Sequence, residues 1–331
     1  MRVAVVGTGS AGRRHLGTLA ELGVTELIAV NEHRPGPSLA VDGASVTTVH
    51  DFGDALAASP HAVVIANPTA LHADYTERAV LAGIPVLCEK PLALDAVQAA
   101  HVRAVADDRG VIVGVCSQFR FHEHLIELRE QLHRGSLGRV VDVVATQGEH
   151  LADYHPDEDY RHSYAARAAL GGGVMLTQVH LFDVVHWLVG PFVRVFAIGG
   201  RRTDLELDVE DSVSFLLEGR SGVAVRGHLD YFRRPRRFTL EVTGTQGNAA
   251  WDYYESVLSF TGSWAHSSAC AFDRPALFRA TVADFLEATR DARPPRTSAE
   301  DAVAVLELVD AARRTLASGV VEPIPLNREA R

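Results

Sequence analysis

The stretch "VAVVGTGSAGRRH", residues 3–15, joins a short apolar run to an expected helix through the spacing G-x-G-x-x-G. In a βαβ unit, Gly7 makes the tight turn, Gly9 leaves room for a pyrophosphate, and Gly12 lets the helix pack on the sheet. The helix N-terminus then faces the anion. The stretch predicts dinucleotide binding, and a glycine-rich turn without a ligand is the alternative. The other predicted cofactor contacts in this loop are Thr8, Ser10 and Ala11.

Glu32 and Arg34, which follow the second apolar run, bear on the choice of dinucleotide. Glu32 follows Gly12 by twenty residues, where a carboxylate would accept hydrogen bonds from the adenosine ribose hydroxyls. A carboxylate there repels a 2′-phosphate, so Glu32 favours NAD. Arg34 lies two residues further on and could bind that phosphate instead. NAD is therefore predicted, and NADP stays open.

The spacing of apolar residues divides the chain into two parts. In residues 1–120, short apolar runs alternate with stretches of helical spacing, which is typical of a parallel sheet covered on both faces. In residues 121–331, alternating strands and glycine-containing turns at 218–222 and 244–248 predict hairpins. We therefore expect an α/β protein: an N-terminal doubly wound Rossmann domain and a C-terminal α+β domain with an open, mostly antiparallel sheet. The expected strands of the first part are 2–7, 26–32, 62–67, 85–90 and 111–116, and its expected helices are 10–22, 71–83 and 95–109.

Composition excludes several classes of function. The chain has 331 residues and a net charge of −10, which argues against a general nucleic-acid or anionic-membrane binder. Its three cysteines are scattered, so neither a disulfide framework nor a zinc site is expected, and the His-Glu-His run at 122–124 lacks a convincing ligand spacing. The N-terminus has no signal-peptide layout, and no long apolar run appears, so we expect a cytoplasmic protein.

The run "VLCEKPLAL", residues 86–94, holds the only lysine of the chain, Lys90. Lys90 ends an expected parallel strand, and ligands of open α/β sheets bind beyond the carboxyl ends of such strands. An ammonium there can donate to a substrate hydroxyl and take part in acid–base chemistry, whereas a guanidinium does not release its proton near pH 7. Lys90 is therefore a candidate catalytic residue, and a surface lysine is the alternative.

Three stretches together resemble the Gfo/Idh/MocA family of oxidoreductases: "GTGSAGRRH", "ANPTALHADYTERAVLAGIPVLCEKPLA" and "GGGVMLTQVHLFDVVHWLVG". The resemblance implies that Lys90 is the active-site lysine and that the last helix, 298–319, can fold back on the Rossmann domain. It also implies a homodimer or homotetramer formed through the C-terminal sheet. The residues that it places beside the cofactor or in the cleft are Asn67, Pro68, Leu71, His72, Glu89, Gln118 and Arg120.

The third stretch supplies a second catalytic candidate. His180 and Asp183 are three residues apart on an expected helix, so they share a face, and a His held by a carboxylate suits proton transfer from an alcohol. An ordinary core histidine is the alternative. The family usually has an Asp one turn before this His, but Leu176 and Thr177 stand here. Thr177 or Gln178 could instead hydrogen-bond a substrate hydroxyl.

Upstream of the glycine-rich turn lie Arg161, Tyr164 and Arg167, which can bind hydroxyls, carboxylates or phosphates. Together the residues and the resemblance predict NAD(P)-dependent hydride transfer at a secondary carbon of a sugar, nucleotide sugar or cyclitol. Lys90 and His180 are expected to handle the proton. Two alternatives stay open: a glycosidase that uses transient oxidation by NAD, and a catalytically silent NAD-binding sensor or scaffold protein.

Overall fold

The computed structural model describes residues 1–32, 39–154, 158–262 and 265–324. The chain forms two compact units. The first unit comprises residues 1–118 and 274–303, and the second comprises 119–273 and 304–331. The sequence predicted a boundary near residue 120 and placed 274–303 in the second domain, whereas the structure groups this segment with the first unit.

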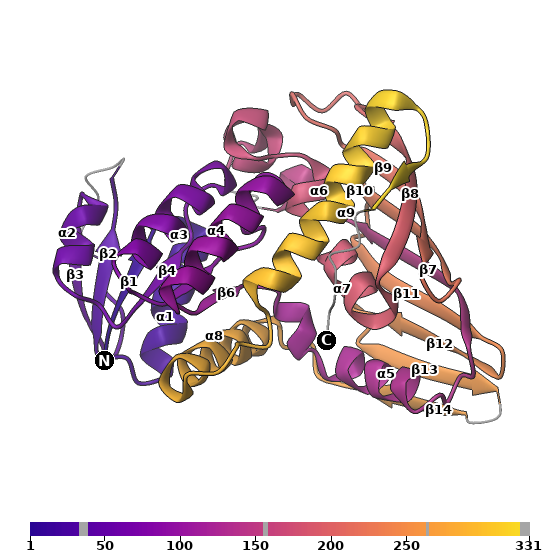
Figure 1. Ribbon diagram of the computed structural model, residues 1–331, viewed down its shortest axis with the longest axis horizontal. Coiled ribbons are helices and arrows are strands. Elements are labelled where there is room, and N and C mark those ends of the chain that lie inside the picture. The colour runs from indigo at the N-terminus through magenta and orange to yellow at the C-terminus, as the bar shows by residue number, and fades with distance from the viewer. Residues whose placement is uncertain (33–38, 155–157, 263–264, 325–331) are drawn as a thin grey trace. The chain divides into compact units, whose positions relative to one another are not determined.

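The first unit is built on a parallel sheet of six strands in the order β3-β2-β1-β4-β5-β6 (Figure 1). This order and its helical crossovers are those of a doubly wound dinucleotide-binding fold, as expected. All five predicted strands are present, and an edge strand in the half-polar run 45–49 adds a sixth. The strands are β1 (Arg2–Val6), β2 (Glu26–Val30), β3 (Ser45–Val49), β4 (Ala62–Ile65), β5 (Val86–Cys88) and β6 (Val113–Val115).

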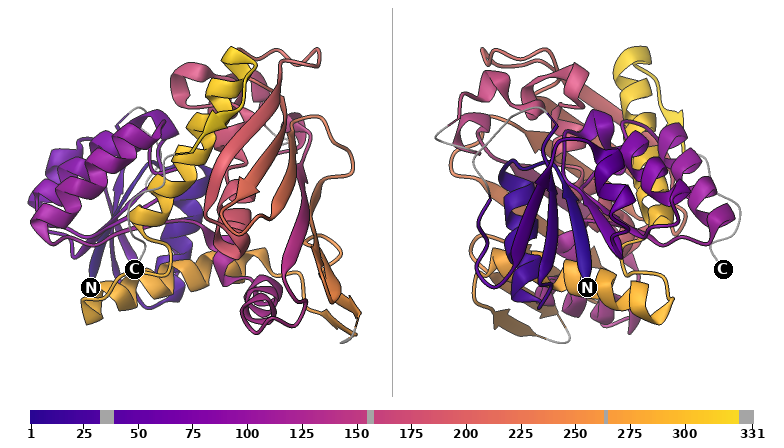
Figure 2. Two further views of the ribbon diagram at one scale, coloured as in Figure 1. Left: turned by 45° about the vertical axis from the view of Figure 1, so that its right-hand side comes forward. Right: turned by 90° about the vertical axis from the view of Figure 1, so that its left-hand side faces the viewer.

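Helices cover both faces of this sheet, as Figure 2 shows. Asp51 and Asp95 cap two of them by accepting hydrogen bonds from backbone N–H groups of the first turn. The last helix of the unit comes from the distant segment 274–303. Its Val282 and Phe285 are buried in the same core as the apolar residues of β1. The helices are α1 (Ser10–Glu21), α2 (Phe52–Ala57), α3 (His72–Leu81), α4 (Ala96–Arg109) and α8 (Arg274–Asp291), with the 3-10 turn η1 (Thr69–Leu71).

Two glycines of the first loop are required by close backbone approach. Gly7 has φ +90°, and a Cβ there would lie 2.7 Å from the carbonyl oxygen of Ala66. A Cβ at Gly12 would lie 1.8 Å from the carbonyl oxygen of Gly7. Any side chain at either position would push α1 away from the sheet.

The second unit is built on a nine-stranded sheet in the order β14-β13-β12-β11-β7-β10-β9-β8-β15. The predicted hairpins at 218–222 and 244–248 join antiparallel neighbours, β9 to β10 and β11 to β12. One pair, β7 and β10, is parallel. The strands are β7 (Val140–Gly148), β8 (Phe192–Gly200), β9 (Ser212–Gly219), β10 (Ala224–Asp230), β11 (Arg237–Gly244), β12 (Gly247–Asp252), β13 (Val257–Gly262), β14 (His266–Ala269) and β15 (Glu322–Pro323).

Helices α5 (Glu123–His133), α6 (Val174–Thr177) and α7 (His180–Val189) pack on one face of this sheet (Figure 1). Helix α9 (Ala299–Ser318) begins in the first unit and runs on in the second, so only its first turn groups with the Rossmann domain. Short 3-10 turns lie between these elements: η2 (Gln118–Phe121), η3 (Leu151–Asp153), η4 (Tyr160–His162), η5 (Tyr164–Ala166) and η6 (Ala168–Leu170).

In the part of the chain that the structure describes, no single helix has the length and apolar character to cross a membrane. One bent pair of segments, Ala168–Thr177 and His180–Val189, passes that test by length and composition only.

Candidate active site

The glycine-rich loop is shaped to receive an anion. Gly9 is the N-cap of α1, and no described side chain caps that helix end. A Cβ built at Gly9 would meet nothing within 4 Å, so the space beside Gly9 is open. Backbone donors, a helix N-terminus and room above the loop are what a pyrophosphate needs. Thr8, Ser10 and Ala11 lie in the same loop with partly or fully exposed surfaces.

Glu32 is fixed just beyond the end of β2. Its carboxylate accepts the backbone N–H of Phe52 at 3.0 Å and the hydroxyl of Tyr75. Burial, with the hydrogen bond and charge of Glu32, raises the pKa of Tyr75 to about 12. A carboxylate accepts up to four hydrogen bonds, so Glu32 retains acceptor capacity for ribose hydroxyls. Arg34 lies outside the described residues, so its predicted part in cofactor choice stays a prediction.

Glu89, next to the lone lysine, is tied to the phosphate-loop helix. One carboxylate oxygen of Glu89 lies 2.8 Å from both the guanidinium of Arg14 and Nε2 of His15. Glu89 and His15 are buried, whereas 30% of the Arg14 side chain is exposed. Burial alone would raise the pKa of Glu89, but His15, Arg14 and Lys90 together hold it well below its usual range. The buried carboxylate therefore anchors the residue before Lys90 to α1.

The neighbouring loop reaches the other side of Lys90. His72 is buried, with Nδ1 2.6 Å from the carbonyl oxygen of Pro91 and Nε2 2.9 Å from that of Asn67. Burial lowers the pKa of His72, although both carbonyl oxygens act in the opposite direction. The His72 ring therefore braces the loop against the lysine segment. A direct cofactor contact by His72 stays a prediction.

The side-chain amide of Asn67 is a second sign of a missing ligand. Its nitrogen and oxygen are both buried and have no hydrogen-bond partner among the described residues. A buried amide without partners is costly, and a ligand with a donor and an acceptor would satisfy it. Pro68 and Leu71, predicted to pass the same ligand, flank it as half-buried residues. Gln118, the last residue of this part of the first unit, is 4% exposed.

In the second unit, the carboxylate predicted to orient His180 has a different principal partner. Asp183 accepts two hydrogen bonds from Nε of Arg120 and one, at 2.7 Å, from its Nη2, and both side chains are buried. Arg120 was predicted to contact substrate; its Nε and Nη2 take part in this ion pair, and a substrate contact stays a prediction. His180 begins α7, is 6% exposed, and packs edge-on against Phe119 with ring centroids 5.0 Å apart.

Gln178 lies in the short break between α6 and α7 and is 2% exposed. Its amide donates to the hydroxyl of Tyr154 at 2.8 Å and to the carbonyl oxygen of Asp230 at 2.9 Å. The hydroxyl of Tyr231 donates to the carbonyl oxygen of Ala165 at 3.4 Å, and burial raises the pKa of both Tyr154 and Tyr231 well above the usual value. Sequence reasoning missed these two tyrosines, which the fold brings from other segments to the residues before His180.

The predicted sugar-binding residues upstream lie on a run of 3-10 turns. Arg161 is exposed and pairs with Asp159 at 2.8 Å and Glu206 at 3.3 Å. Nε of Arg167 donates to the carbonyl oxygen of Arg161 at 2.7 Å. Tyr164 is half-buried in the next turn. The structure thus gathers these three residues on one segment of the second unit, whereas Lys90 belongs to the first, so the convergence of Lys90 with His180 stays a prediction.

Comparisons with known proteins agree with this geometry. A model of an oxidoreductase family with an NAD-binding Rossmann fold (GFO_IDH_MocA) matches residues 1–117, and a model of the GFO/IDH/MocA C-terminal domain matches residues 125–250. The rhizopine catabolism protein MocA of Rhizobium meliloti is 28% identical, with 95% of each chain covered. An inositol 2-dehydrogenase of the same species, strain 1021, is 28% identical over 96% of this chain and 97% of its own length.

A solved structure shows the same architecture. GenD2 from gentamicin A biosynthesis, in complex with NAD, is 27% identical and superposes with a TM-score of 0.83 over 98% of this chain and 97% of that one. Together with the open phosphate loop and the unsatisfied Asn67 amide, this shows that the first unit fits NAD.

Proposed function

Because the chain belongs to the Gfo/Idh/MocA family of oxidoreductases, we propose that it transfers a hydride to or from a secondary hydroxyl or keto carbon of a small polyhydroxylated substrate. The substrate class is a sugar, a nucleotide sugar or a cyclitol, in line with the names of the relatives. The observation that carries the proposal is the position of the lone lysine just after β5. The preceding residue, Glu89, contacts Arg14 and His15 of α1, the helix that follows the glycine-rich loop.

The division of labour follows from the side chains. NAD, when bound, supplies the nicotinamide carbon that accepts or gives the hydride. Lys90 donates to the substrate oxygen, stabilises the alkoxide that develops there, and exchanges the hydroxyl proton. His180 is the second proton-handling group. Asp183 fixes η2 to α7 through Arg120 and so acts as a positioning residue for His180.

Recognition of the substrate hydroxyls falls to the second unit. Gln178 hydrogen-bonds Tyr154 and the carbonyl oxygen of Asp230, which holds its amide in a defined orientation, and Thr177 precedes it in the chain. Arg161, Tyr164 and Arg167 add donors for a carboxylate or a phosphate on larger substrates. Preorganised polar groups of this kind distinguish a correctly placed hydroxyl from its absence.

For the cofactor we propose NAD in preference to NADP. The Glu32 carboxylate accepts the hydroxyl of Tyr75. It lies after the second strand, at the position where the 2′-phosphate of NADP would have to bind. Its negative charge opposes that phosphate and accepts ribose hydroxyls instead. The ratio of kcat/KM for NAD and NADP measures this preference directly.

The decisive experiment is an absorbance screen for NADH formation or consumption with free sugars, nucleotide sugars and cyclitols, in their hydroxyl and keto forms. Once a substrate is found, Lys90→Ala and Lys90→Arg are compared with the wild type. Loss of proton transfer is expected to lower kcat by about 10²- to 10⁴-fold in both variants, with NAD affinity little changed. The arginine variant keeps the charge but cannot release a proton near pH 7, so it separates the two roles.

The outcomes distinguish the alternatives. Full activity in Lys90→Ala would remove the role of the lysine. Turnover of a glycoside without net NADH would favour the glycosidase alternative, and normal NAD binding without turnover across the panel would favour a silent sensor or scaffold. The silent alternative rests on Leu176, a fully buried residue at the position where the family usually has an Asp.

We also propose a homodimer or homotetramer formed through the nine-stranded sheet. Ile198 on β8 and Leu216 on β9 are 59% and 52% exposed. They lie on the face opposite α6 and α7, beside the exposed ion pairs Arg194–Glu218 and Arg226–Asp142, and exposed apolar side chains on an open sheet face favour association. Light scattering coupled to size exclusion measures the assembly, and a monomer at micromolar concentration would contradict the proposal.

A further inference from the structure

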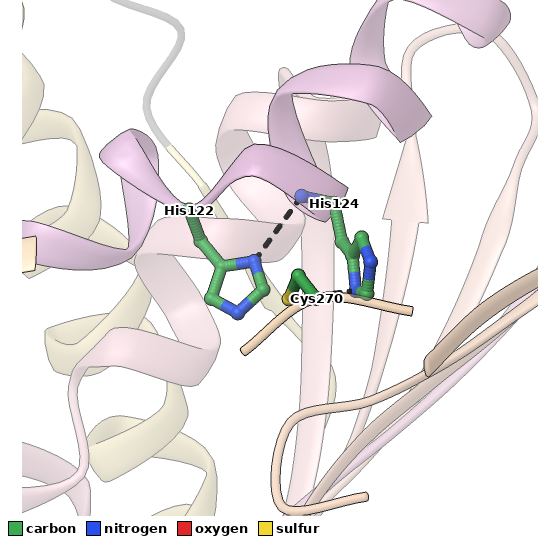
Figure 3. A group of neighbouring side chains, drawn as sticks. All are labelled: His122, His124 and Cys270. Carbon is green, nitrogen blue, oxygen red and sulfur yellow. Dashed lines mark hydrogen bonds between the residues drawn. The ribbon is translucent and has the colours of Figure 1, made fainter. Parts of the chain in front are cut away.

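Three side chains that can bind a metal ion meet in the second unit (Figure 3). His122 and His124 flank the first residue of α5, and Cys270 follows β14 directly. Each offers one nitrogen or sulfur atom, and these atoms all lie within 4.8 Å of one another. His122 and His124 are 5% and 2% exposed, and Cys270 is half-buried. We call these three residues the His-His-Cys cluster.

The distance within the cluster is close to that between two ligands of one zinc ion. Sγ of Cys270 lies 3.7 Å from Nδ1 of His124. Tetrahedral zinc, with Zn–S of about 2.3 Å and Zn–N of about 2.0–2.1 Å, places sulfur and nitrogen ligands about 3.5 Å apart. A shift of a few tenths of an ångström therefore suffices for both atoms to bind one ion.

The chemistry of the three side chains also suits a metal. A neutral imidazole ring has one nitrogen with a free lone pair, which can bind a metal ion. A thiol that coordinates zinc loses its proton outright and binds as thiolate.

The present contacts of the cluster are weak. Nδ1 of His122 accepts the backbone N–H of His124 at 3.2 Å. A neutral imidazole has a single lone pair, so metal binding by His122 exchanges this long hydrogen bond for a metal bond. Nε2 of His124 is buried and has no hydrogen-bond partner among the described residues. Apart from the distant sulfur, nothing that the structure describes satisfies the His124 ring, and buried polar groups normally have partners.

We propose that His122, His124 and Cys270 bind a zinc ion. The nitrogen and sulfur donor set selects zinc over magnesium or calcium, which prefer oxygen. These three residues supply three ligands, and water would complete the tetrahedral coordination. On binding, the thiol proton leaves to solvent and the sulfur binds as thiolate.

The position of the cluster along the chain indicates what the ion does. The chain enters the second unit after Gln118 and leaves it after Asp273, and the cluster lies within a few residues of both points. Zinc would therefore cross-link the start and the end of this long segment and stabilise the second unit. It would do so without changing the chemistry proposed for the first unit.

Zinc binding is tested with untagged, full-length protein freed of metal by a chelator. Zinc is titrated in competition with a chromophoric chelator, and cobalt(II) is used as a spectroscopic probe. We expect one ion per chain and a sulfur-to-cobalt charge-transfer band. Cys270→Ser should abolish that band, and Cys270→Ser and His124→Asn should each weaken zinc binding by at least about 100-fold, since even outer partners of ligands are worth 10- to 100-fold.

The matched control is His266→Asn. His266 lies on β14 four residues before Cys270, is exposed, and is not a member of the cluster. It should bind zinc as the wild type does. Zinc should raise Tm in the wild type and in His266→Asn, but not in Cys270→Ser.

A thiol-labelling experiment needs no variant. Cys88 and Cys116 are fully buried, so Cys270 is the thiol with exposed surface, and zinc should slow its labelling. The proposal would be overturned by any of three results. These are a zinc affinity no higher than that of exposed surface histidines, a cobalt spectrum without a sulfur-to-cobalt band, and a Cys270 labelling rate that zinc does not change. Circular dichroism shows whether a variant is folded before its affinity is interpreted.

Discussion

Replacing Glu89 by Gln tests how strongly the phosphate-loop helix is tied to the lysine segment. The carboxylate is buried, and it contacts Arg14 and His15 at 2.8 Å each. Glutamine has the same shape and keeps one carbonyl acceptor but carries no charge. The variant therefore removes the electrostatic part of the anchor and leaves the packing in place.

The expected cost is worked from these two contacts. A hydrogen bond to a charged group contributes about 1.5–3 kcal/mol, and a neutral one about 1 kcal/mol. Glutamine retains one weakened contact and loses the other. Arg14 is partly exposed and regains water, so the penalty for an abandoned buried charge is reduced. We expect Glu89→Gln to lower the free energy of unfolding by about 3 kcal/mol at pH 7.

The pH dependence gives an independent check. The pKa of Glu89 is lower in the folded protein than its ordinary value of 4.5, so the unfolded chain binds more protons in acid. The stability from Glu89 is fully present above about pH 4.5 and is lost as the pH falls further. The difference between the wild type and Glu89→Gln should therefore shrink by up to about 1.4 kcal/mol per pH unit below pH 4.5.

Urea unfolding without added NAD, at several pH values, measures both effects. Glu26→Gln is the matched control, because Glu26 makes an exposed ion pair with Arg2 at 2.7 Å in the same unit. Exposed pairs contribute about 0–1 kcal/mol, so this variant should stay close to the wild type at every pH. Equal stability of Glu89→Gln and the wild type at pH 7, or a difference that does not change in acid, would refute the reasoning.

Three further variants test other parts of the structure by equilibrium unfolding. Asp183→Asn should lower the free energy of unfolding by about 3–5 kcal/mol, because it leaves the buried charge of Arg120 without its partner. The double change Arg120→Met with Asp183→Leu should recover most of that loss. A double variant as unstable as Asp183→Asn would contradict this. Phe285→Ala should cost about 3–5 kcal/mol through the cavity it leaves in the first unit's core, and a loss under 1 kcal/mol would show that α8 does not pack there. The pKa of Tyr75 is raised from 10.0 to about 12, so the stability that its hydroxyl gains from Glu32 is present below pH 10 and lost by about pH 12. The stability advantage of the wild type over Tyr75→Phe should therefore vanish between pH 10 and pH 12. An advantage that stays constant over this range would contradict the prediction.

The parts of the fold that local sequence dictates were predictable. The glycines at positions 7 and 12 are required by backbone contacts a few ångströms away, and their spacing appears directly in the sequence. The hairpins at 218–222 and 244–248 are likewise local, because two to five turn residues decide them. The edge strand 45–49 escaped prediction because it is polar and half-exposed and has no run of buried residues.

Contacts between distant segments limit what the sequence can predict. Spacing along α7 suggested that Asp183 serves His180, but Arg120, 63 residues earlier, takes the carboxylate in a two-pronged ion pair. The proposed zinc site joins His122 and His124 to a sulfur 146 residues after His124, and spacing along the chain does not indicate such a grouping. Segment 274–303 joins the core of the first unit through apolar residues such as Val282 and Phe285, which resemble those of any amphipathic helix.

The residues on both sides of Lys90 are held in place by contacts with other segments. The residue before Lys90 is fixed by its carboxylate to α1, and the carbonyl oxygen of Pro91 contacts the buried ring of His72. Lys90 therefore rises from a backbone that is held on both sides by other residues. An arginine at this position would keep the positive charge but would not release a proton near pH 7, so Lys90→Arg tests the proposed proton transfer.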